Sequence, residues 1–307
     1  MKKDLLIGSR GSKLALTQAE WVKARLVLAC PEVSVHIEVI KTSGDVRREP
    51  LSAIGGKGVF TKELEDALLD SRIDVAVHSL KDLPTILPEA LTLSAICERE
   101  DARDALVLRQ DCDTDGASIR SLPLRAVLGT SSPRRLAQVK NLRQDLVIKD
   151  LRGNVDTRLR RLDEGLFDAL ILASAGLRRL GLENRITARI SPEEMLPAVG
   201  QGAIGIETRD DDTTAIEAVK KLDHGPTRFA CTAERSLLHA LGGGCQLPIA
   251  AQAVVYYQQL RLEGLVADPE GKKIIRERIS GAVADAEKLG SQLAQRLLER
   301  GAAALLS

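Results

Sequence analysis

The chain of 307 residues is 44% apolar and carries a formal net charge of +1, which is typical of a globular protein of two or three domains and excludes a disordered one. Aromatic residues make up only 2%, which argues against a binder of single-stranded nucleic acid, because such proteins stack bases on aromatic side chains. No apolar run approaches membrane-spanning length, and the run at residues 5–7 is too short for a signal peptide. We therefore expect a cytoplasmic protein without a membrane partner.

Cysteine and histidine give no sign of a disulfide framework or a metal site. The five cysteines are odd in number and form no C-x-x-C motif, and the four histidines lack the i, i+4 spacing of a helical metal pair. We therefore predict no metal ion.

The first third of the chain predicts strands that alternate with helices. Ser12 is a suitable N-cap for a helix with apolar residues at helical spacing. Alternation of this kind predicts a largely parallel sheet, in which ligands bind beyond the carboxyl ends of the strands. The predicted elements are, in order, a strand at 4–8, a helix from 13, a strand at 33–40, a helix that ends near Asp70 and a strand at 73–77.

The middle third repeats this order. Strands are predicted at 126–128, 146–148 and 169–172, and each leads into a helix through small or hydroxyl residues. At the first junction Ser132 is a suitable N-cap and Pro133 suits the first helical position. Exposed amides and the helix dipole favour anions at such junctions.

Arginine is concentrated in the same third. Between Arg125 and Arg189 there are fourteen basic residues, twelve of them arginine, against seven acidic ones. Arginine grips a carboxylate or phosphate with a planar fork, whereas lysine would serve solubility equally well. We expect Arg160 and Arg161 to face water. The arginines for which we favour anion binding are Arg10, Arg134, Arg135, Arg152 and Arg158.

Two further stretches are candidates for a role in catalysis or ligand binding, and each also has a purely structural interpretation. In residues 75–84 an apolar strand runs into a loop where Asp82 either stabilises a cation or moves a proton, or else bonds its own turn. In residues 242–246 (GGGCQ) three glycines precede Cys245, so either a ligand approaches the backbone there, or the segment is a flexible turn with a buried thiol.

Seven short motifs, which occur in order along nearly the whole chain, resemble those of the porphobilinogen deaminase (hydroxymethylbilane synthase) family. They are SRGS at 9–12, GGKG at 55–58, VHSLKD at 77–82, GTSS at 129–132, LRGN at 151–154, VGQG at 199–202 and GGCQ at 243–246.

The resemblance implies an α/β fold with two doubly wound domains like those of periplasmic binding proteins, followed by a C-terminal α+β domain. The expected domains are residues 1–98 with 203–220, the arginine-rich residues 99–202, and residues 221–307, which carry the cofactor cysteine.

The resemblance also implies an activity and a cofactor. Cys245 would hold a dipyrromethane through a thioether, four porphobilinogen molecules would be added with loss of ammonia, and hydrolysis would release the linear tetrapyrrole of porphyrin and haem biosynthesis. Asp82 would be the catalytic residue, whose carboxylate assists loss of the amino group and stabilises positive charge on the pyrrole nitrogen. The residues implied for the cofactor are Cys245, Ser12, Ser79, Lys81, Thr130, Ser132, Arg134, Arg135 and Arg158. The residues implied for the substrate are Arg10, Lys57, Arg152, Arg158, Arg179 and Gln201.

One departure and two other functions stay open. Many members of the family have lysine where this chain has Ala53, so one anion contact is absent or comes from elsewhere. The same two-domain architecture also serves non-catalytic proteins that bind anionic solutes. A nucleic-acid binder would rest on the arginine excess alone, and we expect no nucleic-acid partner. We expect a monomer.

Overall fold

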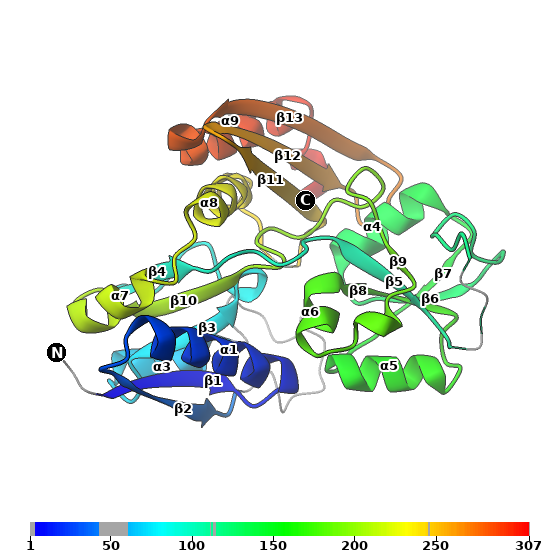
Figure 1. Ribbon diagram of the computed structural model, residues 1–307. Helices are drawn as coiled ribbons and strands as arrows, with labels where there is room; N and C mark the ends of the chain where they lie inside the picture. Colours follow the sequence, from blue (N-terminus) through cyan, green and yellow to red (C-terminus); the bar gives the residue numbers. More distant parts are fainter. Residues whose placement is uncertain (1–3, 43–60, 111, 113–114, 245, 307) are drawn as a thin grey trace. The chain divides into compact units, whose positions relative to one another are not determined.

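The computed structural model describes residues 4–42, 61–110, 112, 115–244 and 246–306 (Figure 1). The chain divides into two compact units, one formed by Met1–Glu100 with Ala203–Arg228 and the other by Asp101–Gly202 with Phe229–Ser307. Each unit is thus built from two separate stretches of sequence. Within the described residues, no helix is long and apolar enough to cross a membrane.

The first unit contains a five-stranded mixed sheet in the order β2-β1-β3-β10-β4. β1 pairs in parallel with β2 and β3, whereas β10 is antiparallel to both β3 and β4. The strands are β1 (Asp4–Arg10), β2 (Ser34–Ile40), β3 (Val75–Ser79), β4 (Leu91–Ile96) and β10 (Ile204–Arg209).

Helices cover both faces of this sheet. Apolar residues of α1 (Lys13–Ala29) and α7 (Thr213–Lys220) share one core with the sheet. On the other face, α3 (Lys62–Leu69) packs against the sheet with its own buried leucines. Because both faces are covered, the central strand β3 is buried along nearly its whole length.

The second unit contains a sheet of the same kind, in the order β7-β6-β8-β5-β9. β6 pairs in parallel with β7 and β8, and β5 is antiparallel to β8 and β9. One face packs on α4 and the other on α5 and α6. The elements are β5 (Asp104–Leu108), β6 (Val127–Gly129), α4 (Pro133–Leu142), β7 (Val147–Lys149), α5 (Val155–Asp163), β8 (Ala169–Ala173), α6 (Ser174–Arg179), the 3₁₀ turn η2 (Glu183–Arg185) and β9 (Ala188–Arg189).

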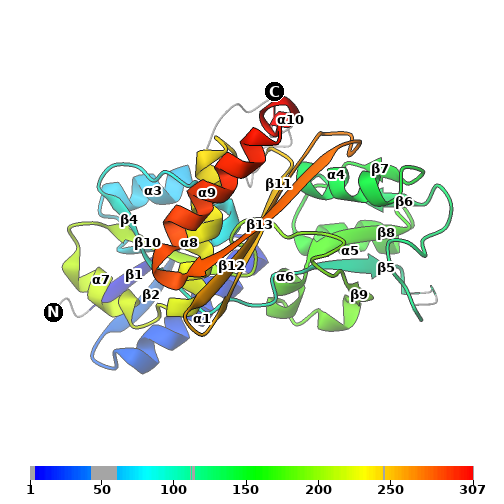
Figure 2. The same ribbon diagram turned by 90° about the horizontal axis from the view of Figure 1, so that it is seen from above.

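A third sheet in the second unit is antiparallel, in the order β11-β12-β13. A Cβ atom added at Gly264 of β12 would lie 2.6 Å from Leu237 of α8 and 3.2 Å from Leu293 of α9, so both helices pack closely on this face (Figure 2). On its other face the sheet shares a core with Ala137 of α4. The elements are α8 (Gly225–Ala240), β11 (Ile249–Tyr256), β12 (Gln259–Ala267), β13 (Ile274–Ala282), η3 (Val283–Asp285), α9 (Ala286–Glu299) and α10 (Ala303–Leu306).

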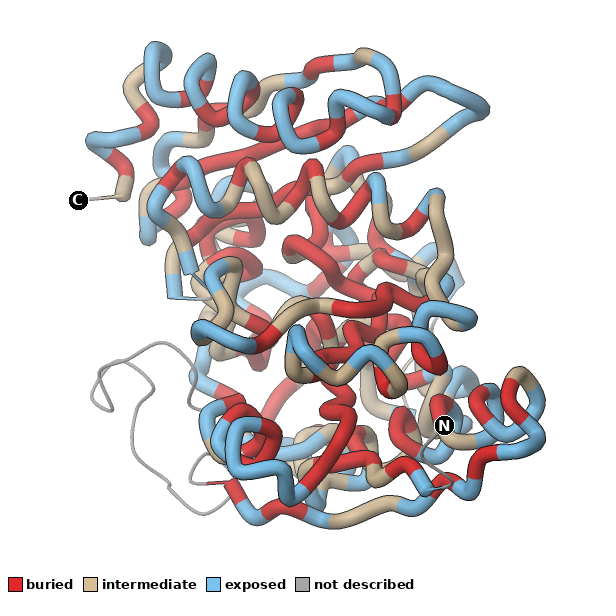
Figure 3. The backbone as a smooth tube through the Cα atoms, turned by 90° about the vertical axis from the view of Figure 1, so that its left-hand side faces the viewer, coloured by how far each residue is buried: buried red, intermediate tan, exposed pale blue. Residues whose placement is uncertain are grey.

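The structure confirms the α/β fold class and the alternation of strands with helices, and Figure 3 shows buried and exposed residues alternating along the helices. The prediction of a largely parallel sheet was wrong in part. Half of the pairings in each five-stranded sheet are antiparallel, because β10 and β5 enter their sheets from the opposite direction. The three domain boundaries stay a prediction, since α8 runs through the division between the two units at residues 228 and 229.

Candidate functional site

The carboxyl edge of the first sheet gathers several of the predicted site residues. β1 and β3 are parallel neighbours, so Arg10 at the end of β1 and Ser79 at the end of β3 lie at the same edge. Ser12 follows β1 and caps α1, where its hydroxyl accepts a hydrogen bond from the Ala15 amide. Asp82 follows β3 in the 3₁₀ turn η1 (Leu80–Asp82). These residues therefore lie at or just beyond the carboxyl ends of parallel strands, where the sequence analysis expects ligands to bind.

The turn that carries Asp82 is held from two sides. The Ser79 hydroxyl and the amide nitrogen of Gln18 on α1 are 3.0 Å apart. The Leu80 amide donates to the Ala203 carbonyl over 3.0 Å, just before β10 begins. Asp82 and Lys81 are half-buried. Within the described residues no hydrogen bond reaches the Asp82 carboxylate, so the alternative in which this Asp bonds its own turn is not realised, and its oxygens are available to a ligand.

The carboxyl edge of the second sheet gathers three strand-to-helix junctions. β7, β6 and β8 are parallel neighbours. Their ends lead respectively to residues 150–154, residues 130–132 and Ser174, which therefore lie along one edge. The Ser174 hydroxyl is buried and has no hydrogen-bond partner among the described residues.

Hydroxyl groups fix the first of these junctions. Ser132 caps α4 by accepting from the Arg135 amide, and Pro133 occupies the first turn, as the sequence predicts. The Thr130 hydroxyl accepts from the Ser132 amide over 3.2 Å. The Ser131 hydroxyl both donates to the Leu151 carbonyl and accepts from the Leu151 amide, which joins two neighbouring junctions. Contact of Thr130 and Ser132 with a ligand stays a prediction.

Arg134 and Arg135 are buried and paired with Asp104, a residue that the sequence analysis did not single out. The Arg134 Nη1 and the Arg135 Nη2 lie 2.7 and 2.8 Å from the Asp104 carboxylate. Burial alone would raise the pKa of Asp104, but the two guanidinium charges outweigh burial and hold its pKa below the usual range. Burial lowers the pKa of Arg135, an effect that Asp104 opposes and the like charge of Arg134 reinforces.

Three other arginines of the second unit are less buried. Arg152 pairs with Asp150 over 2.9 Å, Arg158 donates to the Gly153 carbonyl over 2.7 Å, and Arg179 donates to the Gly202 carbonyl over 2.7 Å. Burial would raise the pKa of Asp150, but hydrogen bonds from Ser131 and Arg152 lower it overall. These three arginines remain candidates for anion binding.

Gln201 has a structural role that the sequence did not indicate. It is fully buried, and its amide nitrogen donates to the Ala102 carbonyl over 2.7 Å and to the Asp104 carboxylate over 2.9 Å. One residue earlier, the Gly200 amide donates to the buried carboxylate of Glu234 on α8 over 2.7 Å. Direct substrate contact by Gln201 therefore stays only a prediction. Asp104 and Glu234 escaped sequence analysis because their partners are distant in the chain.

Two predicted site residues, Cys245 and Lys57, lie outside the described residues, as does Ala53. Their roles stay predictions.

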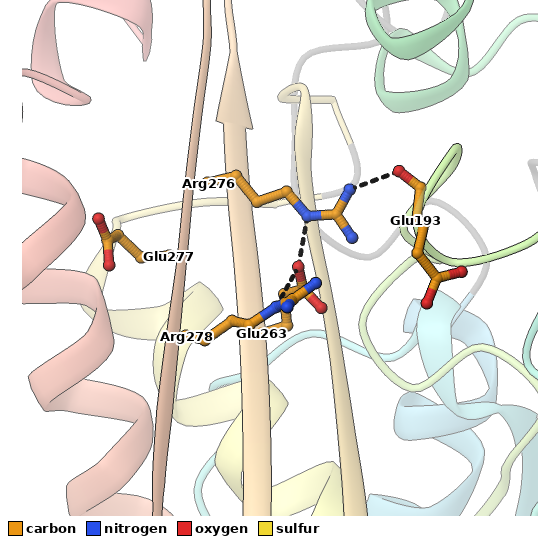
Figure 4. Close-up of a pocket in the computed structure, with 5 residues that line it drawn as sticks. All are labelled: Glu193, Glu263, Arg276, Glu277 and Arg278. Carbon is orange, nitrogen blue, oxygen red and sulfur yellow. Dashed lines mark hydrogen bonds and ion pairs between the residues drawn. The ribbon is translucent and has the colours of Figure 1, made fainter.

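A separate recess of about 490 Å³ lies on the third sheet and is lined by charged residues (Figure 4). Arg276 and Arg278 both pair with Glu263 there. Arg276 also donates to the backbone carbonyls of Pro192 and Glu193 over 2.7 and 2.8 Å. These charged groups have partners within the protein, and Arg276 connects β13 to residues 192–193. We therefore do not take the recess as the candidate site.

Comparison with known proteins covers nearly the whole chain. Residues 5–217 match the family model described as porphobilinogen deaminase, dipyromethane cofactor binding domain, and residues 228–299 match that of the porphobilinogen deaminase C-terminal domain. A porphobilinogen deaminase of Pelotomaculum thermopropionicum is 49% identical over 307 residues, which cover 100% of this chain and 97% of the relative. That of Desulforudis audaxviator is 50% identical over 308 positions, covering 100% and 98%.

Solved structures give weaker likenesses. The BenM effector binding domain with its effector benzoate is 16% identical, with a TM-score of 0.44 over 72% of this chain and 90% of that one. The periplasmic VFT2 domain of Bordetella pertussis BvgS is 15% identical, with a TM-score of 0.42 over 72% and 86%. These scores are too low to bear on the fold or the function. The family models and the full-length relatives suffice, and they show that the chain belongs to the porphobilinogen deaminase family.

Proposed function

We propose that this chain is a hydroxymethylbilane synthase. It condenses four porphobilinogen molecules in sequence onto a dipyrromethane primer bound to Cys245, and hydrolysis then releases the linear tetrapyrrole. The observation that carries this proposal is the carboxyl edge of the second sheet, where guanidinium and hydroxyl groups collect at three parallel strand ends. A growing chain of pyrroles gains carboxylate side chains with every ring, and an arginine-rich edge suits such a polyanion.

The residues at this edge fit a cofactor that carries carboxylates. Arg134 and Arg135 share a single buried carboxylate, Asp104, so the group keeps one positive charge in excess. The buried Ser174 hydroxyl, without a partner among the described residues, lies at the same edge. The residues that would hold the cofactor are Thr130, Ser132, Arg134, Arg135 and Arg158 in the second unit and Ser12, Ser79 and Lys81 in the first, with Cys245 as the attachment point. When bound, the dipyrromethane supplies a tethered pyrrole carbon that accepts the next ring.

Asp82 stabilises the positive charge that develops during each condensation. In each condensation the bond from the aminomethyl carbon of porphobilinogen to nitrogen breaks, ammonia leaves, a carbon–carbon bond forms, and a pyrrole carbon loses its proton. Positive charge develops on the substrate ring as ammonia departs. An ionised carboxylate within hydrogen-bonding distance of the pyrrole N–H stabilises that charge. The fixed turn after β3 presents Asp82 at the sheet edge for this purpose.

The substrate is held through its own carboxylates. Arg10 lies at the edge that carries Asp82, and Arg152, Arg158 and Arg179 lie in the second unit. Forked charge-assisted hydrogen bonds from these residues orient the ring and cost little side-chain ordering per bond. Lys57 and Gln201 are the remaining candidates for this role.

The alternative is a non-catalytic protein that binds anionic solutes with the same architecture. Family membership favours the enzyme. The deciding experiment incubates the purified protein with porphobilinogen and follows ammonia and tetrapyrrole together. The enzyme releases four ammonia molecules per tetrapyrrole, whereas binding of porphobilinogen without consumption would support the alternative.

We also propose that the protein is cytoplasmic and monomeric. Sedimentation of the purified protein tests the second of these, since a stable dimer at micromolar concentration would contradict it.

A further inference from the structure

A single buried carboxylate organises the arginine pair at the start of α4. Asp104 is the first residue of β5 and is fully buried. Its Oδ2 accepts from the Arg134 Nη1 over 2.7 Å, and its Oδ1 accepts from the Arg135 Nε and Nη2 over 3.1 and 2.8 Å. The same Oδ1 accepts from the Gln201 amide over 2.9 Å. No other carboxylate among the described residues pairs with either guanidinium.

The charges of this cluster do not balance. Two guanidinium groups and one carboxylate leave an excess of one positive charge in a place where water is largely excluded. A buried cluster that served packing alone would be expected to be neutral, because an unpaired buried charge is costly. One further anion would neutralise the excess.

The guanidinium groups also keep donors for such an anion. Each guanidinium has five N–H donors. Arg134 uses two on Asp104 and one on the Leu196 carbonyl, and Arg135 uses two on Asp104 and one on the Ile171 carbonyl. Among the described residues, two donors on each therefore have no acceptor. Both side chains are fixed in direction while part of each fork stays unused.

Asp104 and the arginine pair are also connected to both ends of the segment 101–202. Gln201 bridges the Asp104 carboxylate and the Ala102 carbonyl. Arg134 and Gln138 both donate to the Leu196 carbonyl, and Gln138 accepts from the Leu196 amide. The position of the two guanidinium groups is thus tied to residues 196–202.

We propose that Asp104 is a positioning residue for attachment of the cofactor, an inference that rests on the proposed function. It directs the unused N–H donors of Arg134 and Arg135 to a carboxylate of the incoming pyrrole, and it leaves the one positive charge that this carboxylate neutralises. Asp104 itself does not touch the reacting atoms.

The test measures attachment and not turnover. Apoprotein is made in cells that cannot produce porphobilinogen and is then mixed with porphobilinogen, and the covalent gain in mass is followed by intact-mass spectrometry. The variant is Asp104→Asn, which keeps the shape and removes the charge. The matched control is Asp145→Asn, which breaks a bidentate aspartate–arginine pair just beyond the other end of α4. Rates are expressed per folded molecule, from circular dichroism of the same samples.

We expect Asp145→Asn to gain mass at the wild-type rate and Asp104→Asn to do so about tenfold more slowly or worse, the effect of losing one charge-assisted interaction. Asp104→Glu keeps the charge but displaces it by one methylene, so it serves if the Asn variant does not fold, and we expect it to be slowed as well.

A purely structural role would lower the melting temperature but leave the rate per folded molecule unchanged. If folded Asp104→Asn or Asp104→Glu gained mass at the wild-type rate, this inference would be wrong, while the proposed function would still stand. If neither the wild type nor Asp145→Asn gained mass, the proposed function would fail and this inference with it.

Discussion

The two five-stranded sheets share one plan but differ in the chemistry at their carboxyl edges. In each, three neighbouring strands are parallel, and one strand of opposite direction, β10 or β5, separates them from the last strand, in the orders β2-β1-β3-β10-β4 and β7-β6-β8-β5-β9. The first edge presents a turn with one half-buried carboxylate, Asp82. The second presents three junctions rich in arginine and hydroxyl groups. We therefore propose that the same scaffold supports charge development at the edge that carries Asp82 and binding of several carboxylates at the arginine-rich edge.

The buried polar groups behind the two edges differ in the same sense. In the part of the first unit that the structure describes, the Glu207 carboxylate has one side-chain nitrogen partner, the His78 Nε2 at 2.9 Å. In the second, Asp104 has two guanidinium partners. The His78–Glu207 pair contains one basic side chain for one carboxylate. The cluster around Asp104 contains two guanidinium groups for one carboxylate, so it has one positive charge in excess. The buried cluster behind the second edge therefore leaves a positive charge that an anion can neutralise, whereas the buried pair behind the first edge does not.

The largest expected effect comes from removing the attachment point. Cys245→Ser replaces the thiol that forms the thioether, so we expect complete loss of covalent cofactor and of tetrapyrrole synthesis. Intact mass and product formation measure both. The matched control is Cys112→Ser, which removes a partly exposed thiol, and we expect it to be active. Near-normal turnover of Cys245→Ser would contradict the attachment.

Asp82→Asn should distinguish the catalytic role of the first edge from retention of the cofactor. The substitution removes the carboxylate that stabilises positive charge, so we expect kcat to fall by roughly 10²–10³-fold. The cofactor should stay attached, because in the proposed function the thioether at Cys245 holds it and Asp82 does not. Single-turnover kinetics and intact mass measure the two effects. The control is Asp70→Asn, an exposed acid of the same unit. An unchanged kcat would mean that another group does the chemistry.

Arg152→Gln should weaken substrate binding at the second edge. Loss of one charge-assisted hydrogen bond to a substrate carboxylate lowers kcat/KM by about tenfold or more. Arg160→Gln is the control, since Arg160 is exposed and its one ion-pair partner among the described residues is Glu164. Equal kcat/KM values for the two variants would remove Arg152 from the substrate site.

The smallest effect concerns stability of the first unit. Burial raises the pKa of Glu65, with the charge of Glu207 also raising it and Thr61 and His78 opposing. The folded state therefore holds this proton more tightly than the unfolded state, so the free energy of unfolding falls as pH rises from the ordinary value of 4.5 toward the raised value.

Glu65→Gln removes this titration. We expect the variant to gain stability relative to the wild type between pH 4 and pH 7, measured by urea unfolding. Glu217→Gln, on the exposed side of α7, is the control for loss of one surface charge. If the free energy of unfolding differed between Glu65→Gln and the wild type by the same amount at pH 4 and pH 7, the raised pKa of Glu65 would be contradicted.

The sequence predicted the features that depend on local order. Ser12, Ser132 and Pro133 start their helices as expected, because capping depends on neighbours in the chain. The alternation of strands and helices was also predicted correctly. Asp104 could not be found in this way. It lies 30 positions from Arg134 in the chain, and they meet only because β5 pairs antiparallel with β8.

The central claim is that a pyrrole primer is bound to Cys245. Intact-mass spectrometry of the purified wild-type protein, followed by peptide mapping and staining with Ehrlich's reagent, tests it most directly. The account predicts a mass above that of the bare polypeptide, a modified peptide that contains Cys245, and the colour of a pyrrole. A bare-polypeptide mass with a free thiol at Cys245 and no colour would contradict it.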